Sequence, residues 1–408
     1  MKNVPELRFA GFDGEWEENR IGQLSKKVIG GGTPSTKVEK YWNGTIPWIQ
    51  TSDLDDESIK INAFNKFISY DAIENSSAKI IEPGSISVVT RVGVGKVVRV
   101  NENYATSQDF TNLSELNSDT TFTTYSIKKI MGRLSSSLQG TSIKGITQRE
   151  LLSTKLYLPH NQTEQEKIGD LFKKIDALIE KQEDKVSKLK DFKKSMIQKM
   201  FPKKDELVPE FRFDGFDDEW NKITISDLYS KAGSGGTPSS KVSEYYNGDI
   251  PFLSISDLTN STVLINETGK SITELGLNNS SAWIVPSGSI TLAMYASVGK
   301  VAISNIDLAT SQAFFNMIIN DNNSTEFVYQ TLKKMEIFNE WRNQITTGTQ
   351  PNLNATIINN TILLVPNLEE QEKIGNFFKN LDSKIETEKK LLDSYKMMKK
   401  SLLQKMFV

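Results

Sequence analysis

The chain has 408 residues, no cysteine and one histidine, His160. Without cysteine, disulfides, thiolate zinc sites, iron–sulfur clusters and thiol catalysis are excluded. The 49 basic side chains nearly balance 51 acidic ones, and the net charge of -2 does not by itself indicate nucleic-acid binding. No apolar run approaches the roughly 18–20 residues that span a bilayer, and the N-terminal residues lack the pattern of a secretory signal. We therefore expect a soluble, intracellular protein of two or three domains.

The chain consists of two copies of one unit. The recurring strings are VPELRFAGFDGEW (4–16) and VPEFRFDGFDDEW (208–220), GGTPSTK (31–37) and GGTPSSK (235–241), NSSA (75–78 and 279–282), and ATSQDF (105–110) and ATSQAF (309–314). All are offset by 204 residues, whereas EQEKIG (164–169 and 370–375) and QKMF (198–201 and 404–407) are offset by 206. This period exceeds the roughly 20–50 residues of solenoid repeats, so the sequence predicts a duplicated domain.

The globular part of each copy is predicted to mix strands and helices. Short apolar runs between turn residues, SISVVT (85–90) and GSITLAM (288–294), predict strands. Residues 125–138 and 327–344 are expected to form helices. The predicted fold class is therefore α+β.

Each copy ends in a long predicted helix. From 164 to 201, and again from 370, apolar residues recur at alternating steps of three and four without an internal proline, which is typical of a coiled-coil seam. Each helix would be about 57 Å long. We expect the two helices to pair antiparallel and to join two globular domains related by a pseudo-twofold axis.

One polar residue interrupts each seam, Gln182 in the first helix and Glu388 in the second. If the helices pair antiparallel, these residues would meet near the centre and fix the register at some cost in stability. The alternative is that both side chains merely tilt away from the seam.

Catalytic patterns are not recognisable in the sequence. GVGK at 93–96 lacks the spacing of a phosphate-binding loop, and the acidic run at 53–57 is better explained as a solvated loop because its counterpart at 257–261 loses most acids. His160 is expected to be solvated. We therefore predict no catalytic residue, no metal ligand and no cofactor in this chain.

The predicted division is a first globular domain (1–163), a helix with linker (164–207), a second globular domain (208–369) and a final helix (370–408). If each domain reads half of a target, shared polar loop residues would do generic work and divergent ones would set sequence choice. The candidate contact residues are Thr33, Lys37, Ser52, Arg91, Lys96, Ser107, Gln108, Thr141, Ser142 and Lys144 in the first copy, and Thr237, Lys241, Ser256, Tyr295, Lys300, Ser311, Gln312, Thr349 and Gln350 in the second. The alternative is that the matched residues only maintain the fold, which we favour for Thr33, Pro34 and Ser107.

Charge is distributed unevenly. Residues 164–204 contain 12 lysines and 8 acids, residues 370–408 contain 9 lysines and 6 acids, and the remainder carries a net charge of -9. A DNA-binding chain of this kind would either gather its basic residues on one face or depend on a partner that supplies positive charge.

The order domain–helix–domain–helix, the GGTPS loop, the EQEKIG motif that follows a proline at the entry to each helix (PxxxxEQEKIG in the first copy, PxxxEQEKIG in the second) and the closing QKMF resemble the specificity subunit of type I restriction–modification systems. The resemblance covers essentially the whole chain. It implies that each globular unit is a target recognition domain for one half of a bipartite, asymmetric site in double-stranded DNA. The helices would set the spacer and dock two modification (methyltransferase) subunits.

The resemblance also implies that the cofactors belong to other subunits. The methyltransferase subunits would bind S-adenosylmethionine, restriction subunits would use ATP and Mg²⁺, and the complex would be cytoplasmic, without a membrane partner. The rival hypothesis is a coiled-coil scaffold whose two domains bind proteins or glycans, and DNA binding that weakens steeply with salt would separate the two.

Overall fold

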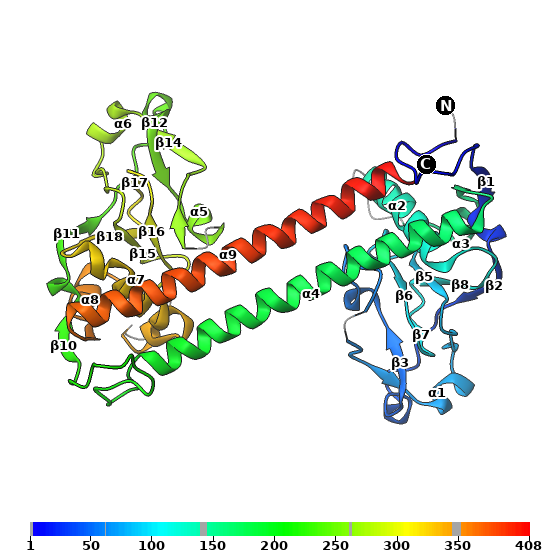
Figure 1. The fold of residues 1–408 in the computed structure, drawn as a ribbon, viewed down its shortest axis with the longest axis horizontal. Helices are drawn as coiled ribbons and strands as arrows, with labels where there is room; N and C mark the ends of the chain where they lie inside the picture. Colours follow the sequence, from blue (N-terminus) through cyan, green and yellow to red (C-terminus); the bar gives the residue numbers. More distant parts are fainter. Residues whose placement is uncertain (1–2, 62, 139–144, 261–262, 345–351) are drawn as a thin grey trace. The chain divides into compact units, whose positions relative to one another are not determined.

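The computed structural model describes residues 3–61, 63–138, 145–260, 263–344 and 352–408 (Figure 1). It divides into two compact units: unit 1 is Met1–Glu183 with Leu391–Val408, and unit 2 is Asp184–Lys390. Each unit therefore combines one globular domain with part of both long helices, α4 (Gln162–Met200) and α9 (Leu368–Lys405). The sequence-based division at 163, 207 and 369 separates globular parts from long helices, whereas these two units are defined by their internal contacts. That division therefore stays a prediction.

Unit 1 contains a four-stranded sheet in the order β2-β8-β5-β6, a three-stranded sheet β4-β3-β7 and a β1-β9 ribbon. Its strands are β1 (Glu17–Arg20), β2 (Ser25–Gly30), β3 (Ile46–Ile49), β4 (Phe67–Ile68), β5 (Ile86–Val89), β6 (Val97–Arg99), β7 (Ala105–Thr106), β8 (Phe110–Leu116) and β9 (Lys155–Leu158). Its shorter helices are α1 (Tyr70–Asn75), α2 (Thr120–Leu138) and α3 (Gln148–Ser153).

Unit 2 repeats this plan with sheets β11-β18-β15-β16-β13 and β14-β12-β17 and a β10-β19 ribbon. Its strands are β10 (Asn221–Thr224), β11 (Tyr229–Ser234), β12 (Tyr246–Leu253), β13 (Leu264–Ile265), β14 (Lys270–Ile272), β15 (Ile290–Ala293), β16 (Val301–Ser304), β17 (Ala309–Thr310), β18 (Phe314–Ile319) and β19 (Ile362–Val365). Its shorter helices are α5 (Ile255–Asn260), α6 (Glu274–Asn278), α7 (Thr325–Ile337) and α8 (Ala355–Asn360).

The two apolar runs singled out in the sequence form central strands. All four residues of β5 are buried, and β5 pairs antiparallel with β6 and β8; Ile86 lies opposite both Arg99 and Leu113. Strand β15 is buried in the same way between β16 and β18. A strand covered on both faces reads as a continuous apolar run, which is why both predictions are confirmed.

The motif before each long helix anchors that helix to its own domain. Asn161 caps the start of α4, since its side chain accepts a hydrogen bond from the Thr163 amide at 2.9 Å. Gln165 donates to the Pro159 carbonyl at 2.9 Å, and Glu164, fully buried, receives a bidentate pair from Arg8 at 2.6 and 2.8 Å. The same contacts recur before α9, where Asn367 caps the helix, Gln371 binds Pro366, and Arg212 binds Glu370.

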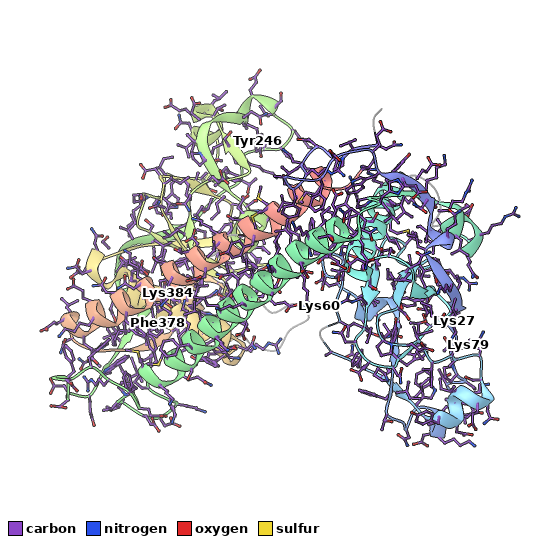
Figure 2. The ribbon with its side chains drawn as sticks, turned by 45° about the vertical axis from the view of Figure 1, so that its right-hand side comes forward. Lys27, Lys60, Lys79, Tyr246, Phe378 and Lys384 are labelled. Carbon is purple, nitrogen blue, oxygen red and sulfur yellow. The ribbon has the colours of Figure 1, made fainter. Side chains whose placement is uncertain are left out.

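The far end of each helix lies in a hydrophobic core. In unit 1 the Phe407 ring lies 5.0 Å from Phe122 and 5.5 Å from Phe172. In unit 2 Phe201 stacks 5.6 Å from Phe327 and lies 6.0 Å from Phe378, which Figure 2 marks on α9. The repeated QKMF string is therefore the segment that inserts a helix end into a domain core.

Within each unit the two long helices run antiparallel. In unit 1 Asp176 and Glu183 of α4 form ion pairs with Lys399 and Lys396 of α9, respectively, so partner numbers fall as those of α4 rise. In unit 2 Lys185 and Lys193 pair with Glu388 and Asp382 in the same sense. The antiparallel arrangement predicted from the sequence is confirmed in both units.

Two details differ from the sequence-based expectation. The helix expected over 327–344 ends at Ile337; Asn339 is left-handed (φ 54°) and a short 3-10 turn follows over Glu340–Asn343. This break places Trp341 in the core, against Gly299. Several residues of the expected seam are instead exposed, namely Leu178, Phe192, Leu391 and Met398.

Candidate DNA interface

In each unit three repeated motifs meet at one place. The glycines of the GGTPS loop lie directly on backbone: a Cβ on Gly31 would lie 1.9 Å from the Ser107 carbonyl oxygen, and one on Gly32 would lie 2.1 Å from that of Ser77. Ser107 belongs to the ATSQ motif and Ser77 to NSSA. Gly235 and Gly236 make the same close approach to Thr310 and Ser281 in unit 2. Only glycine permits this contact between loops.

A side-chain hydrogen bond closes each cluster. The Thr33 hydroxyl donates to Gln108 Oε1 in unit 1, and the Thr237 hydroxyl donates to Gln312 Oε1 at 2.5 Å in unit 2. Both pairs are exposed. With the oxygen engaged by the threonine, each exposed glutamine still has an amide nitrogen that can donate hydrogen bonds.

A buried asparagine, which the sequence reasoning missed, supports each loop pair. Asn112 Nδ2 donates to the Ile29 carbonyl and to Thr106 Oγ1, both at 3.0 Å. Asn316 does the same toward Gly233, at 3.2 Å, and toward Thr310 Oγ1, at 2.8 Å. Their spacing of 204 residues was the signal that could have found them.

The candidate lysines differ in their surroundings. Lys37 and Lys241 are exposed, and neither has an ion pair with a described residue. Lys96 instead donates to the Leu54 carbonyl at 2.7 Å and lies 3.2 Å from Asp56, so it holds the acidic loop 53–57 in place. Its counterpart Lys300 is half-buried.

The candidate serines form local contacts. Ser107 is buried and donates to Asp109 at 3.2 Å, while Ser311 is half-buried. Ser52 accepts a hydrogen bond from Gln50 at 2.9 Å, and Ser256 bonds to Ser254 at 2.8 Å. Gln50 in unit 1 corresponds to Ser254 in unit 2. The serine that both copies share, Ser52 or Ser256, therefore has a different hydrogen-bond partner in each.

The copies differ at one hairpin turn, where RVGVGK (91–96) corresponds to YASVGK (295–300). In unit 1 the exposed Arg91 and Gln108 line a cavity of about 480 Å³ together with Gly31 and Thr147. In unit 2 Tyr295 replaces Arg91 and lines a cavity of about 600 Å³ with Trp341 and Arg342. The turn in unit 2 carries two left-handed non-glycine residues, Ala296 (φ 40°) and Ser297 (φ 94°). Such strained residues occur preferentially at functional sites.

Five candidate residues, Thr141, Ser142, Lys144, Thr349 and Gln350, lie outside the described residues. Of the register residues, Gln182 is buried and Glu388 is half-buried, and Glu388 lies 2.5 Å from Lys185. Their register role stays a prediction. His160 is exposed and lies 3.3 Å from Glu17.

Within the described ranges, no three carboxylate or imidazole side chains form a potential metal site. Among those same residues, no helix is both long and apolar enough to cross a membrane.

Comparison with known proteins identifies the family. The model of the "Type I restriction modification DNA specificity domain" matches residues 13–191 and again 217–395. The MjaIX specificity subunit of Methanocaldococcus jannaschii is 36% identical over 174 residues, which cover 42% of this chain and 40% of that one. The HindI specificity subunit of Haemophilus influenzae is 29% identical over 42% of this chain, and that match spans 38% of its length.

Other similarities extend over the whole chain. The MjaVIII specificity subunit of Methanocaldococcus jannaschii is 22% identical over 98% of this chain and 94% of its own. The crystal structure of the type I restriction–modification S subunit of M. genitalium superposes with a TM-score of 0.63 at 18% identity, covering 99% of both chains, and shows the same fold. These matches confirm the predicted resemblance to type I DNA specificity subunits. The chain therefore belongs to the family of type I restriction–modification DNA specificity subunits and contains the specificity domain twice.

Proposed function

We propose that this chain selects the DNA sequence on which a type I restriction–modification complex acts. Each globular domain, the first within 1–163 and the second within 208–369, reads one half of a bipartite, asymmetric site. The observation that supports this most directly is the pair of matched loop clusters, built alike around Thr33–Gln108 and Thr237–Gln312, beside divergent residues Arg91 and Tyr295.

The chemistry of these residues suits the two tasks. Exposed glutamine amides and exposed lysines can donate to phosphate or to base edges, whereas arginine at one hairpin and tyrosine at the other would favour different bases. Two related but unequal domains allow two different half-sites. The candidate residues outside the described ranges belong to stretches whose sequences also diverge between the copies.

The long helices are proposed to dock two methyltransferase subunits and to set the spacer between half-sites. Apolar side chains that would normally be buried stay exposed on them: Leu178 and Phe192 on α4, and Leu391, Met397 and Met398 on α9. Exposed apolar residues on an amphipathic helix mark protein interfaces. In this proposal S-adenosylmethionine, ATP and Mg²⁺ bind to the methyltransferase and restriction subunits, and this chain is non-catalytic.

The decisive experiment exchanges one domain. Residues 17–160 are replaced by those of a related specificity subunit, the chain is co-expressed with its methyltransferase, and methylated adenines are mapped by single-molecule sequencing. The expected result is a new first half-site and an unchanged second one. A change in both halves would contradict modular recognition, and DNA binding that is independent of salt would favour a scaffold.

The spacer role needs a separate test. Seven residues are removed between Asp176 and Lys193, and seven between Asp382 and Lys399, so that both buried ion pairs are kept. Each helix then shortens by about 10 Å, and we expect the spacer to shorten by about three base pairs. The half-sites should stay the same, and an unchanged spacer would exclude the role.

A further inference from the structure

Unit 2 contains a cavity of about 500 Å³ at the junction of α4, α7 and α9. Its polar lining includes five lysines but only two carboxylates, Asp382 and Glu386. The lysines are Lys190, Lys193, Lys194, Lys333 and Lys389. We call this the lysine cavity. Its lining has an excess of three positive charges, in a chain whose net charge is -2.

The second observation is a buried hydroxyl in the lining of this cavity. Tyr329 is fully buried, and its hydroxyl is unpaired with respect to the described residues. Asp382 instead accepts from Gln330 Nε2 at 3.0 Å and lies 2.7 Å from Lys193. A buried hydroxyl without a partner is unfavourable unless a ligand or a water supplies one.

Unit 1 provides an internal comparison. There Tyr125, which corresponds to Tyr329, donates its hydroxyl to Asp176. The cavity at this junction holds only about 110 Å³. Lys399 Nζ donates to the Glu57 carbonyl at 3.0 Å, and Lys60, marked in Figure 2, binds Glu180 at 2.6 Å, so the unit's own loop closes the space.

The linings of the two cavities have opposite net charges, although several equivalent positions line both. Positions 206 residues apart line both: Lys396 and Lys190, Lys399 and Lys193, Asp176 and Asp382, Glu180 and Glu386. Where unit 1 has Glu183, unit 2 has Lys389, and where unit 1 has Asp55, unit 2 has Thr259. The unit 1 cavity is lined by five carboxylates and two lysines, so an anion is excluded there and favoured in unit 2.

Three of the lysines differ in how strongly they are engaged. Burial lowers the pKa of Lys193, which already faces Asp382. Lys190 and Lys194 are exposed at the rim and have no ion pair with a described residue. Their ammonium groups remain available to a ligand, while Ile197 and Ile337 supply an apolar wall.

We propose that the lysine cavity binds a small phosphate-bearing anion, with the Tyr329 hydroxyl and the rim lysines Lys190 and Lys194 as donors. Free pyrophosphate and the phosphate chain of a nucleotide share this chemistry, and the apolar wall would accept the base of the latter. The site is separate from the loop clusters assigned to DNA, so it does not rest on the proposed function.

The test is calorimetric titration of the full chain with pyrophosphate, ADP and adenosine at constant ionic strength. Pyrophosphate should bind with one-to-one stoichiometry. Tyr329→Phe, which removes only the unpaired hydroxyl, should weaken it at least fivefold without lowering the melting temperature. Lys190→Gln with Lys194→Gln should weaken it at least tenfold. The matched control is Lys396→Gln, the unit 1 counterpart of Lys190, which should bind pyrophosphate like the unaltered chain.

The outcomes separate the alternatives. Tighter binding of ADP than of pyrophosphate would support the site with a nucleotide as its ligand, and equal binding would support free phosphate. Adenosine binding as tightly as ADP would overturn the proposal, as would affinity that ignores Tyr329→Phe or falls equally in Lys396→Gln. If Tyr329→Phe weakened binding of a DNA duplex in the same proportion, the cavity would belong to DNA and the proposal would also fail.

Discussion

Lys399 of α9 and Asp176 of α4 form an ion pair at 2.6 Å, with side chains only 10% and 9% exposed. Lys193 and Asp382 repeat this relationship in unit 2 at 2.7 Å, with 11% and 12% exposure. In each unit the pair joins the two antiparallel helices at the place where the domain packs on them. A buried charge is tolerated only with its partner present, so these pairs oppose any other register of the helices.

Removing one member of the pair should therefore be costly. Asp176→Asn leaves the Lys399 ammonium buried without its counter-charge, and we expect the free energy of unfolding in urea to fall by about 3–5 kcal/mol. The control is Asp184→Asn, which breaks an exposed pair with Lys188 and should cost less than about 1 kcal/mol. Equal effects in the two variants would show that burial does not determine the cost.

Phe407 is a core residue of unit 1, although it lies near the end of the chain. Phe407→Ala leaves a void beside Phe122 and Phe172 and should lower the free energy of unfolding by about 3–5 kcal/mol. Met397→Ala, at a side chain that is 72% exposed, should change it by less than about 0.5 kcal/mol. A Phe407→Ala variant as stable as Met397→Ala would rule out this role.

Lys128 should make stability depend on pH. Burial, with the nearby Lys399, lowers its pKa to about 8, while the unfolded chain keeps the ordinary value of about 10.4. Between these values the unfolded state binds more protons, so the free energy of unfolding rises with pH, by about 2 kcal/mol from pH 7.5 to 9.5.

The variant Lys128→Leu introduces the residue that unit 2 carries at this position, Leu332, and should reduce the rise by about 2 kcal/mol. The remaining rise belongs to Lys129, since burial also lowers its pKa to about 8. Urea unfolding at the two pH values measures it. The exposed Lys79→Leu should retain the rise seen in the unaltered chain, and the same slope in Lys128→Leu would refute the assignment.

The hairpin residues Arg91 and Tyr295 should act on different half-sites. Arg91→Ala is expected to weaken DNA binding of the complex with its methyltransferase about tenfold and to relax one position of the first half-site, since a bidentate base contact is worth about 1–3 kcal/mol. Tyr295→Ala should relax only the second half-site.

Competition binding with single-base variants of the site measures both effects. Lys384→Ala, on an exposed part of α9 (Figure 2), removes a charge without touching either hairpin and serves as the control. Loss of specificity in both halves from either hairpin variant would contradict separate recognition.

The sequence by itself determined the duplication, the α+β class and the two long helices. Repeats at 204 and 206 residues and apolar steps of three and four are local properties, and they need no knowledge of which segments meet. The motif at the entry to each helix could be recognised in the sequence as a repeated string. Its structural role, in which Asn161 caps the helix and Arg8 binds the buried Glu164, required the structure because Arg8 and Glu164 lie 156 residues apart.

Only the tertiary structure decided which apolar residues are buried. Phe192 and Leu391 fit the seam pattern but remain exposed, while Phe407 and Phe201 enter domain cores, because burial depends on contacts between distant segments. The predicted helix over 327–344 breaks at Asn339 because Trp341 packs on Gly299, a residue about forty positions earlier. The opposite charges of the two junction cavities likewise arise where α4, α9 and a domain converge, and no single segment carries that information.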